Sequence, residues 1–118
     1  LCAIADFGNK DDVKKIINDF SAYAKIAEVK EEGSVLWAKW LKAEKSTEGY
    51  DADIVKQYQE EYSAIFNKLT AIKVNDDLAS DFGAIKKAME ANLLLLASKQ
   101  AALQKDKTAR TLIDALDI

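Results

Sequence analysis

Apolar side chains recur every three or four residues along most of this chain, which is the spacing of an amphipathic α-helix. Near the N-terminus this spacing predicts a first helix that starts at Asn9 or Asp11 and continues to about Lys30. The apolar positions that define it are Val13, Ile16, Ile17, Phe20, Tyr23, Ala24 and Ala27.

The next segment contains Gly33 and Ser34, a pair typical of a helix end followed by a new N-cap. We therefore expect a second helix there. Its buried face would carry Leu36, Trp37, Trp40 and Leu41. The alternative is a single bent helix through Gly33, because Ile26, Val29, Leu36 and Trp40 nearly continue one apolar seam.

The clearest loop spans residues 46–51, which are mainly polar and include Gly49. A third helix follows, with an apolar face more than five turns long. That face comprises Ile54, Val55, Tyr58, Tyr62, Ile65, Phe66, Leu69 and Ile72. Asn75, Asp76 and Asp77 then supply a turn and a helix cap.

The fourth helix is expected to start near Asp76, or near Ala84 if the Phe82-Gly83 pair interrupts it, and to end at residues 104–107. Its expected buried face comprises Ile85, Met89, Asn92 or Leu93, Leu96 and Leu103. A short terminal helix over residues 108–116 would follow, capped by Asp106 or Thr108 and carrying Leu112, Ile113 and Leu116. Because the connection at residues 75–77 is so short, the third and fourth helices should form an antiparallel pair.

These segments predict an all-α fold, an up-and-down helical bundle of four main helices plus a short C-terminal helix. No linker or internal repeat divides the chain, so residues 1–118 are expected to form a single helical-bundle domain. The run from Leu93 to Leu96 covers nearly every side of its helix, because successive residues advance by about 100°. Three interpretations follow: a central helix, a protein interface, or the wall of an apolar cavity.

Composition narrows the possible chemistry. The 118 residues include no histidine, the usual general base and a frequent metal ligand, and one cysteine, Cys2. Acidic pairs such as Glu60-Glu61 are adjacent in sequence, so on a helix their carboxylates diverge. Asp51-Ala52-Asp53 lacks the other ligands of a calcium loop. We therefore expect no enzyme, no catalytic residue, no metal site and no cofactor.

Charge and hydropathy bear on the partners. Seventeen basic and 20 acidic residues are interleaved, giving a net charge of −3 and no basic field for nucleic acid. No apolar run approaches the roughly 18 residues that a transmembrane segment requires, so a soluble protein is expected. Leu1 to Ala5 resembles the end of a signal peptide, which raises the hypothesis of secretion; the alternative is an N-terminal arm packed on the bundle. The localisation is otherwise unknown.

Three apolar features are candidates for function. Trp37 and Trp40 share a helix face, and tryptophan is enriched at the energetic centres of interfaces. The aromatic residues at four-residue spacing in the third helix form a ladder, and the leucine run is the third feature. Core packing is the ordinary interpretation of the aromatic residues. The candidate binding residues are Trp37, Trp40, Tyr58, Tyr62, Phe66, Leu94 and Leu95.

Two functions are compatible with these residues. The first is a non-enzymatic interaction module that presents an apolar helix surface either to a protein partner or, by self-association, to another copy of itself. The second is a carrier of an apolar, fatty-acid-like small molecule in a cavity between helices. Asn92 lies among the buried positions of the fourth helix, where its amide would need a hydrogen-bonding partner.

Overall fold

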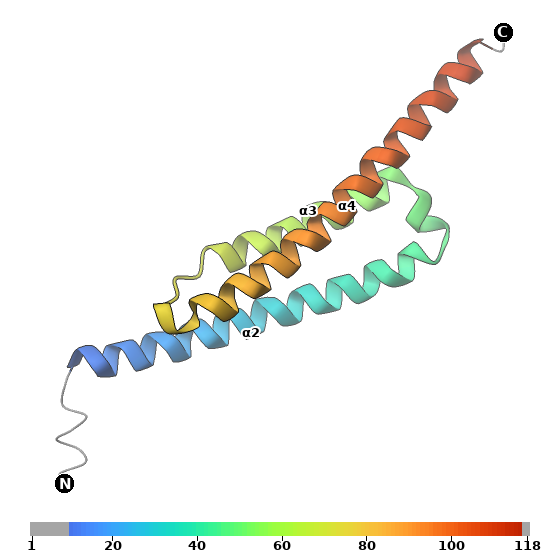
Figure 1. Cartoon of the computed structure of the whole chain (residues 1–118). Coiled ribbons are helices and arrows are strands. Elements are labelled where there is room, and N and C mark those ends of the chain that lie inside the picture. The colour runs from blue at the N-terminus through green and yellow to red at the C-terminus, as the bar shows by residue number, and fades with distance from the viewer. Residues whose placement is uncertain (1–9, 117–118) are drawn as a thin grey trace.

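Three long helices make up most of the chain in a computed structural model that describes residues 10–116. They are α2 (Lys10–Glu44), α3 (Ala52–Thr70) and α4 (Asp76–Leu116), and the short 3-10 helix η1 (Thr47–Tyr50) connects the first two (Figure 1). The all-α class is confirmed for this part of the chain, whereas the expected four helices plus a short fifth are wrong in number. The hypotheses about Leu1 to Ala5 lie outside the described residues.

The expected helix break at Gly33 does not occur, and the alternative of one helix from Lys10 to Glu44 is correct. A glycine that ends a helix adopts a positive φ, but no described glycine has one. Gly33 is instead buried inside α2, where a Cβ atom would lie 3.4 Å from Met89 Cε of α4 and 3.9 Å from Ile65 Cγ2 of α3. The missing side chain therefore permits close packing rather than a turn.

The expected restart at Ala84 and the separate terminal helix are also wrong, because α4 is continuous over 41 residues. Gly83 lies within it without a positive φ. Thr108 and Thr111, placed where a new helix was expected, donate hydroxyl hydrogen bonds of 2.9 Å to the carbonyls of Gln104 and Lys107. These threonine hydroxyls thus bond back into the preceding turn of the same helix instead of capping a new one.

The loop predicted at residues 46–51 is confirmed as the connection between α2 and α3. Ser46 Oγ donates to the Ala43 carbonyl at 2.9 Å and accepts from the Glu48 amide at 3.2 Å. Asp51 is the N-cap of α3, since its Oδ1 accepts from the amides of Asp53 and Ile54. Gly49 is buried against α2, so that a Cβ atom there would lie 2.6 Å from Glu44 Cα.

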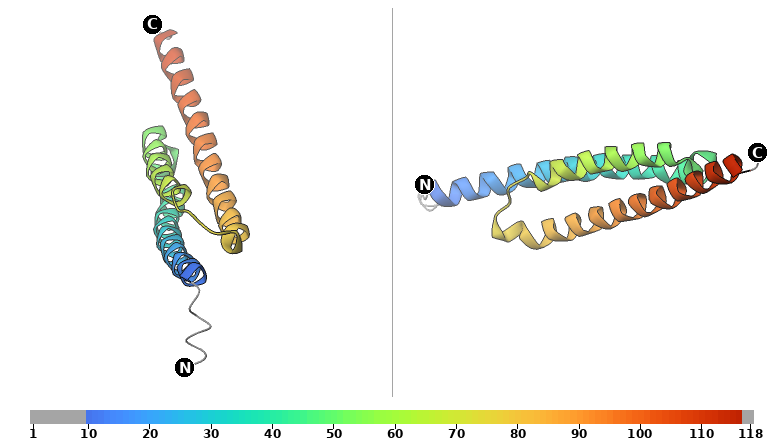
Figure 2. Two further views of the ribbon diagram at one scale, coloured as in Figure 1. Left: turned by 90° about the vertical axis from the view of Figure 1, so that its left-hand side faces the viewer. Right: turned by 90° about the horizontal axis from the view of Figure 1, so that it is seen from above.

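Helices α3 and α4 form the expected antiparallel pair, joined by residues 71–75 (Figure 1). Helix α3 also packs along α2. In the right-hand view of Figure 2, these two helices overlap and α4 runs along one side of them. The core runs along their junction. Its buried members are Ile26, Val29, Trp40, Ala43, Val55, Tyr62, Leu69, Met89 and Leu96.

The molecule is elongated, with extents of 88 × 21 × 16 Å and a radius of gyration of 21.6 Å. A compact domain of 100 residues has a radius of gyration of about 13 Å. The shape follows from the lengths of the helices. At a rise of about 1.5 Å per residue, α4 with its 41 residues is much longer than α3 with its 19 residues. The C-terminal part of α4 consequently extends past the α2–α3 connection (Figure 1).

Candidate interaction surface

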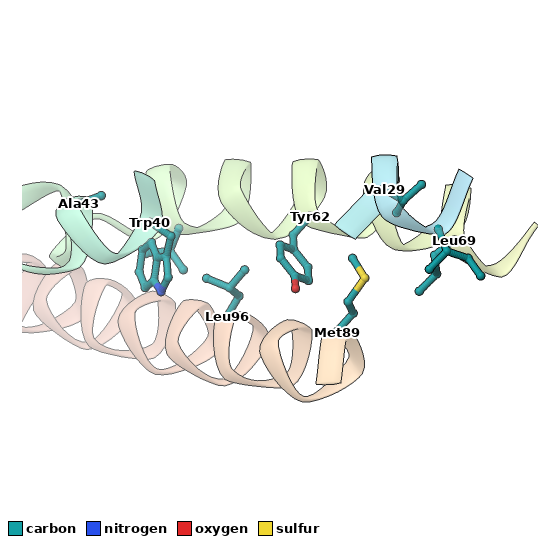
Figure 3. Packing of buried hydrophobic residues seen from close by; sticks show 9 residues of the cluster. Val29, Trp40, Ala43, Tyr62, Leu69, Met89 and Leu96 are labelled. Atoms are coloured by element: carbon teal, nitrogen blue, oxygen red, sulfur yellow. The ribbon is translucent and has the colours of Figure 1, made fainter. Parts of the chain in front are cut away.

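Most of the aromatic candidates lie in the core. Trp40 and Tyr62 are each only 3% exposed, and their side chains point toward α4, where Leu96 and Met89 point back at them (Figure 3). The Trp40 and Tyr58 rings lie 5.5 Å apart, and the Trp37 and Tyr62 rings meet edge to face at 5.6 Å. Trp40 and Tyr62 are therefore unavailable as an exposed binding surface.

The remaining members of the ladder, Tyr58 and Phe66, are half-buried and pack against the same core. The amide of Asn92 finds the partner that its position requires, since its Nδ2 donates to the Tyr62 hydroxyl at 3.0 Å. Among residues 11–116 no polar or charged residue is buried. The Asn92–Tyr62 hydrogen bond thus joins α4 to α3 at the part-buried edge of the core.

Lys99 is a core-edge residue that the sequence analysis did not single out. Its Nζ lies 5.3 Å from the centroid of the Trp40 ring and 5.6 Å from that of Tyr50, and it pairs with Glu44 at 3.7 Å. A cation over an aromatic face is attracted by the ring quadrupole. The contact joins α4 to α2 and η1, so no local sequence spacing could have revealed it.

An open groove of about 360 Å³ runs between α2 and α4. Trp37 and Leu41 line its α2 side, Ile85 and Met89 line its α4 side, and Tyr62 also contributes. The groove reaches the solvent, because Leu41 is 43% exposed and Ala38 and Ala88 along its margins are also exposed. Of the seven candidate residues, the structure brings only Trp37 and Tyr62 together here.

The leucine run divides between two sides of α4. Leu96 is 1% exposed in the core, whereas Leu94 and Leu95 are 68% and 61% exposed. The interpretation of α4 as a central helix is therefore wrong, since α2 and α3 cover only one of its sides (Figure 2). Leu94 and Leu95 form a surface separate from the aromatic candidates.

Leu95 belongs to a line of ten exposed residues on the outer side of α4, which we call the outer seam. Successive members are three or four residues apart, so they lie along one side of the helix, as the core positions of a coiled coil do. Eight of them are alanine or leucine. The outer seam comprises Ala84, Ala88, Ala91, Leu95, Ser98, Ala102, Lys105, Ala109, Leu112 and Leu116, all of them exposed.

After Leu103, the side of α4 that continues the core-facing side becomes charged. Up to that residue the side facing α2 and α3 is apolar, but its continuation carries Lys107, Arg110 and Asp114. The outer side remains apolar to the end of the described helix, with Leu112 61%, Ile113 63% and Leu116 85% exposed. Among residues 10–116, no part of the chain covers these exposed leucines at the end of α4.

In the N-terminal part of α2, too, polar side chains face the rest of the molecule and large apolar side chains face the solvent. Its polar side holds the α3–α4 connection, because Asn75 Nδ2 donates to Asp19 Oδ1 at 2.8 Å and Lys15 pairs with Asp77 at 3.1 Å. Its other side exposes a patch of large apolar residues. They are Ile16, Ile17, Phe20 and Tyr23, which are 46%, 59%, 73% and 67% exposed.

In the Lys15–Asp77 ion pair each group shifts the pKa of the other. The hydrogen bond from the Lys15 ammonium, aided by the opposite charges, raises the pKa of Lys15 and lowers the pKa of Asp77 from their usual values. Both groups are at the surface, so this contact positions the start of α4 rather than creating a reactive group.

Comparisons with known proteins give no identification, since no protein-family model, curated protein or solved structure matches this chain. Within the described part, none of the helices is both long and apolar enough to cross a membrane.

Proposed function

We propose that this chain is a non-enzymatic interaction module that binds a protein partner, or another copy of itself, through the outer seam of α4. The supporting observation is the exposure of Leu95, Leu112 and Leu116, the three leucines of the outer seam. Monomeric proteins rarely expose continuous apolar surface over such a length, and exposed patches of this kind mark interaction sites. The heptad-like spacing suits a helix as the partner.

The test compares the wild-type chain with a Leu95→Lys/Leu112→Lys variant, in which both introduced charges lie on the exposed outer seam and leave the core intact. Each protein is immobilised and exposed to the purified chain and to an extract of its source organism. We expect wild type to retain the chain itself, or a specific protein, at least tenfold more strongly than the variant. Equal retention of every protein by both forms, with equal helicity by circular dichroism, would contradict the proposal.

The second candidate, a carrier of an apolar small molecule, is supported by the groove that contains Trp37 and Tyr62. Its volume lies at the lower end of the range for small-molecule sites, which is about 300 to 1,000 Å³. Its openness counts against it, because such sites usually bury most of the ligand surface. Titration with a fatty acid should quench or shift the emission of Trp37 if this candidate is right, and an unchanged spectrum of wild type beside Trp37→Phe would refute it.

A further inference from the structure

The partner of the outer seam follows from how its two halves differ in size. The first half contains only alanines up to Ala91, whereas the last part carries Leu112 and Leu116. Two copies of α4 in parallel would place alanine against alanine at one end and leucine against leucine at the other. In an antiparallel pair Leu112 and Leu95 each lie against an alanine, so leucine does not meet leucine, an arrangement that fills a helix interface more evenly.

Charge along α4 points to the same orientation. From Asp76 to Leu95 acidic residues outnumber basic ones by four to two, and from Ala97 to Leu116 basic residues outnumber acidic ones by four to two. A parallel pair would place like charge against like charge in both halves. An antiparallel pair opposes the two helix dipoles and lays the net acidic half of each α4 alongside the net basic half of the other. Of the basic residues, Lys105 lies on the outer seam itself, whereas Lys99 and Lys107 pair with Glu44 and Asp53 on the inner side.

We propose that the occupant of the outer seam is the α4 helix of a second copy of this chain, lying antiparallel and centred near Ser98. This inference rests on the proposed function and names its partner. In this register Leu112 faces Ala84 of the second copy, and Leu95 lies beside Ala102 of the second copy. Lys105, a charged member of the seam, comes within reach of Glu90 of the second copy.

The first experiment measures mass by light scattering over a hundredfold range of concentration. Wild type should shift from monomer to dimer, and Leu95→Lys/Leu112→Lys should remain monomeric with unchanged helicity. The matched control is Phe20→Lys, which places the same charge on another exposed apolar patch and should dimerise like wild type. Loss of the dimer in Phe20→Lys instead, or a wild-type monomer throughout, would overturn the proposal.

The second experiment determines orientation with spin labels in a Cys2→Ser background, which removes the natural thiol. Labels at Ala84→Cys should lie roughly 40 Å apart in the antiparallel dimer, because 28 residues of helix at about 1.5 Å each separate them. A parallel dimer would bring them to about 10 Å, the spacing of packed helices, before the label arms are added. Mixing Ala84→Cys with Leu112→Cys copies should give the short distance, and a short distance for Ala84→Cys alone would refute the orientation.

The two proposals fail in different ways. A wild-type monomer that still retains another protein through Leu95 and Leu112 would overturn the second copy as the partner but leave the interaction module intact. Vesicles of neutral and anionic phospholipid provide a further check. Sedimentation with these vesicles that Leu95→Lys/Leu112→Lys abolishes would assign the seam to a lipid surface and refute both proposals.

Discussion

The inner and outer sides of α4 contain similar numbers of leucines but have opposite environments. Leu96 is 1% exposed between α2 and α3, and its neighbour Leu95 is 61% exposed. Burial of an apolar side chain stabilises the folded chain in proportion to the area removed from water. The inner side therefore determines whether the monomer folds, whereas the outer side is left for association.

The largest expected effect compares these two neighbours. Leu96→Ala should lower the free energy of unfolding by about 2 to 5 kcal/mol, because it leaves a cavity in the core. Leu95→Ala should change it by less than about 0.5 kcal/mol in the monomer. Urea denaturation at low protein concentration measures both. Equal losses for the two variants would mean that the outer side also has an intramolecular partner.

The next comparison places one methyl group in a packed position and in an open one. Gly49→Ala should destabilise the chain by roughly 1 to 3 kcal/mol, because the new Cβ would collide with backbone atoms of Glu44. Gly83→Ala should stabilise it by up to about 1 kcal/mol, because a Cβ there meets no atom within 4 Å and alanine favours the helix. Thermal unfolding followed by circular dichroism gives both signs, and a stabilising Gly49→Ala would show that the connection can move.

Polar residues on the two sides of α4 give a smaller contrast. Asn92→Ala removes the hydrogen bond to the Tyr62 hydroxyl and should cost about 0.5 to 1.5 kcal/mol. Ser98→Ala on the outer seam should stay within about 0.5 kcal/mol of wild type. A double-mutant cycle with Tyr62→Phe isolates the free energy that the Asn92–Tyr62 hydrogen bond contributes to folding. Additive losses for Asn92→Ala and Tyr62→Phe would indicate that the bond contributes nothing.

The smallest effect is the pH dependence caused by the surface pair Lys15–Asp77. Because the folded-state pKa of Asp77 is lowered, its stabilisation is present above the unfolded value, about 3.9, and is lost as the pH falls through the folded-state pKa. For Lys15, whose pKa is raised, it is present below about 10.4 and lost as the pH rises through the folded-state pKa. In a plot of the urea unfolding midpoint against pH, Asp77→Asn should reduce both the fall at acidic pH and the fall at basic pH. If the variant loses stability at both ends of the pH range as wild type does, groups other than Lys15 and Asp77 cause the loss.

Much of the fold was predictable because it depends on local patterns. The helical class, the loop at residues 46–51, α3 and the packing of Tyr62 all follow from apolar spacing and turn residues. The error at Gly33 has a tertiary cause, since a glycine that ends a helix and one that admits Met89 look alike in sequence. The first two predicted helices form the single helix α2, and the predicted fourth and terminal helices form the single helix α4.

The candidate site was predictable only in part. Four consecutive leucines occupy all sides of a helix, so their spacing does not reveal which of them a neighbouring helix covers. The sequence named Leu94 and Leu95 as candidates, and the structure exposes both. The sequence did not single out the alanines of the outer seam, which carry little hydrophobic signal. The Lys99 contact with Trp40 joins separate helices and depends on the complete fold.

The end of α4 has a consequence for proteolysis. Beyond Leu103 every described side chain is exposed, and this stretch contains Lys105, Lys107 and Arg110, three sites for trypsin. An isolated helix of this length is marginal in water, so the last turns should open often and be cut before the packed helices. Pairing through the outer seam would cover Lys105 but leave Lys107 and Arg110 exposed on the other side of the helix. The rate of tryptic cleavage at Lys105, relative to that at Lys107 and Arg110, should therefore fall as the protein concentration rises.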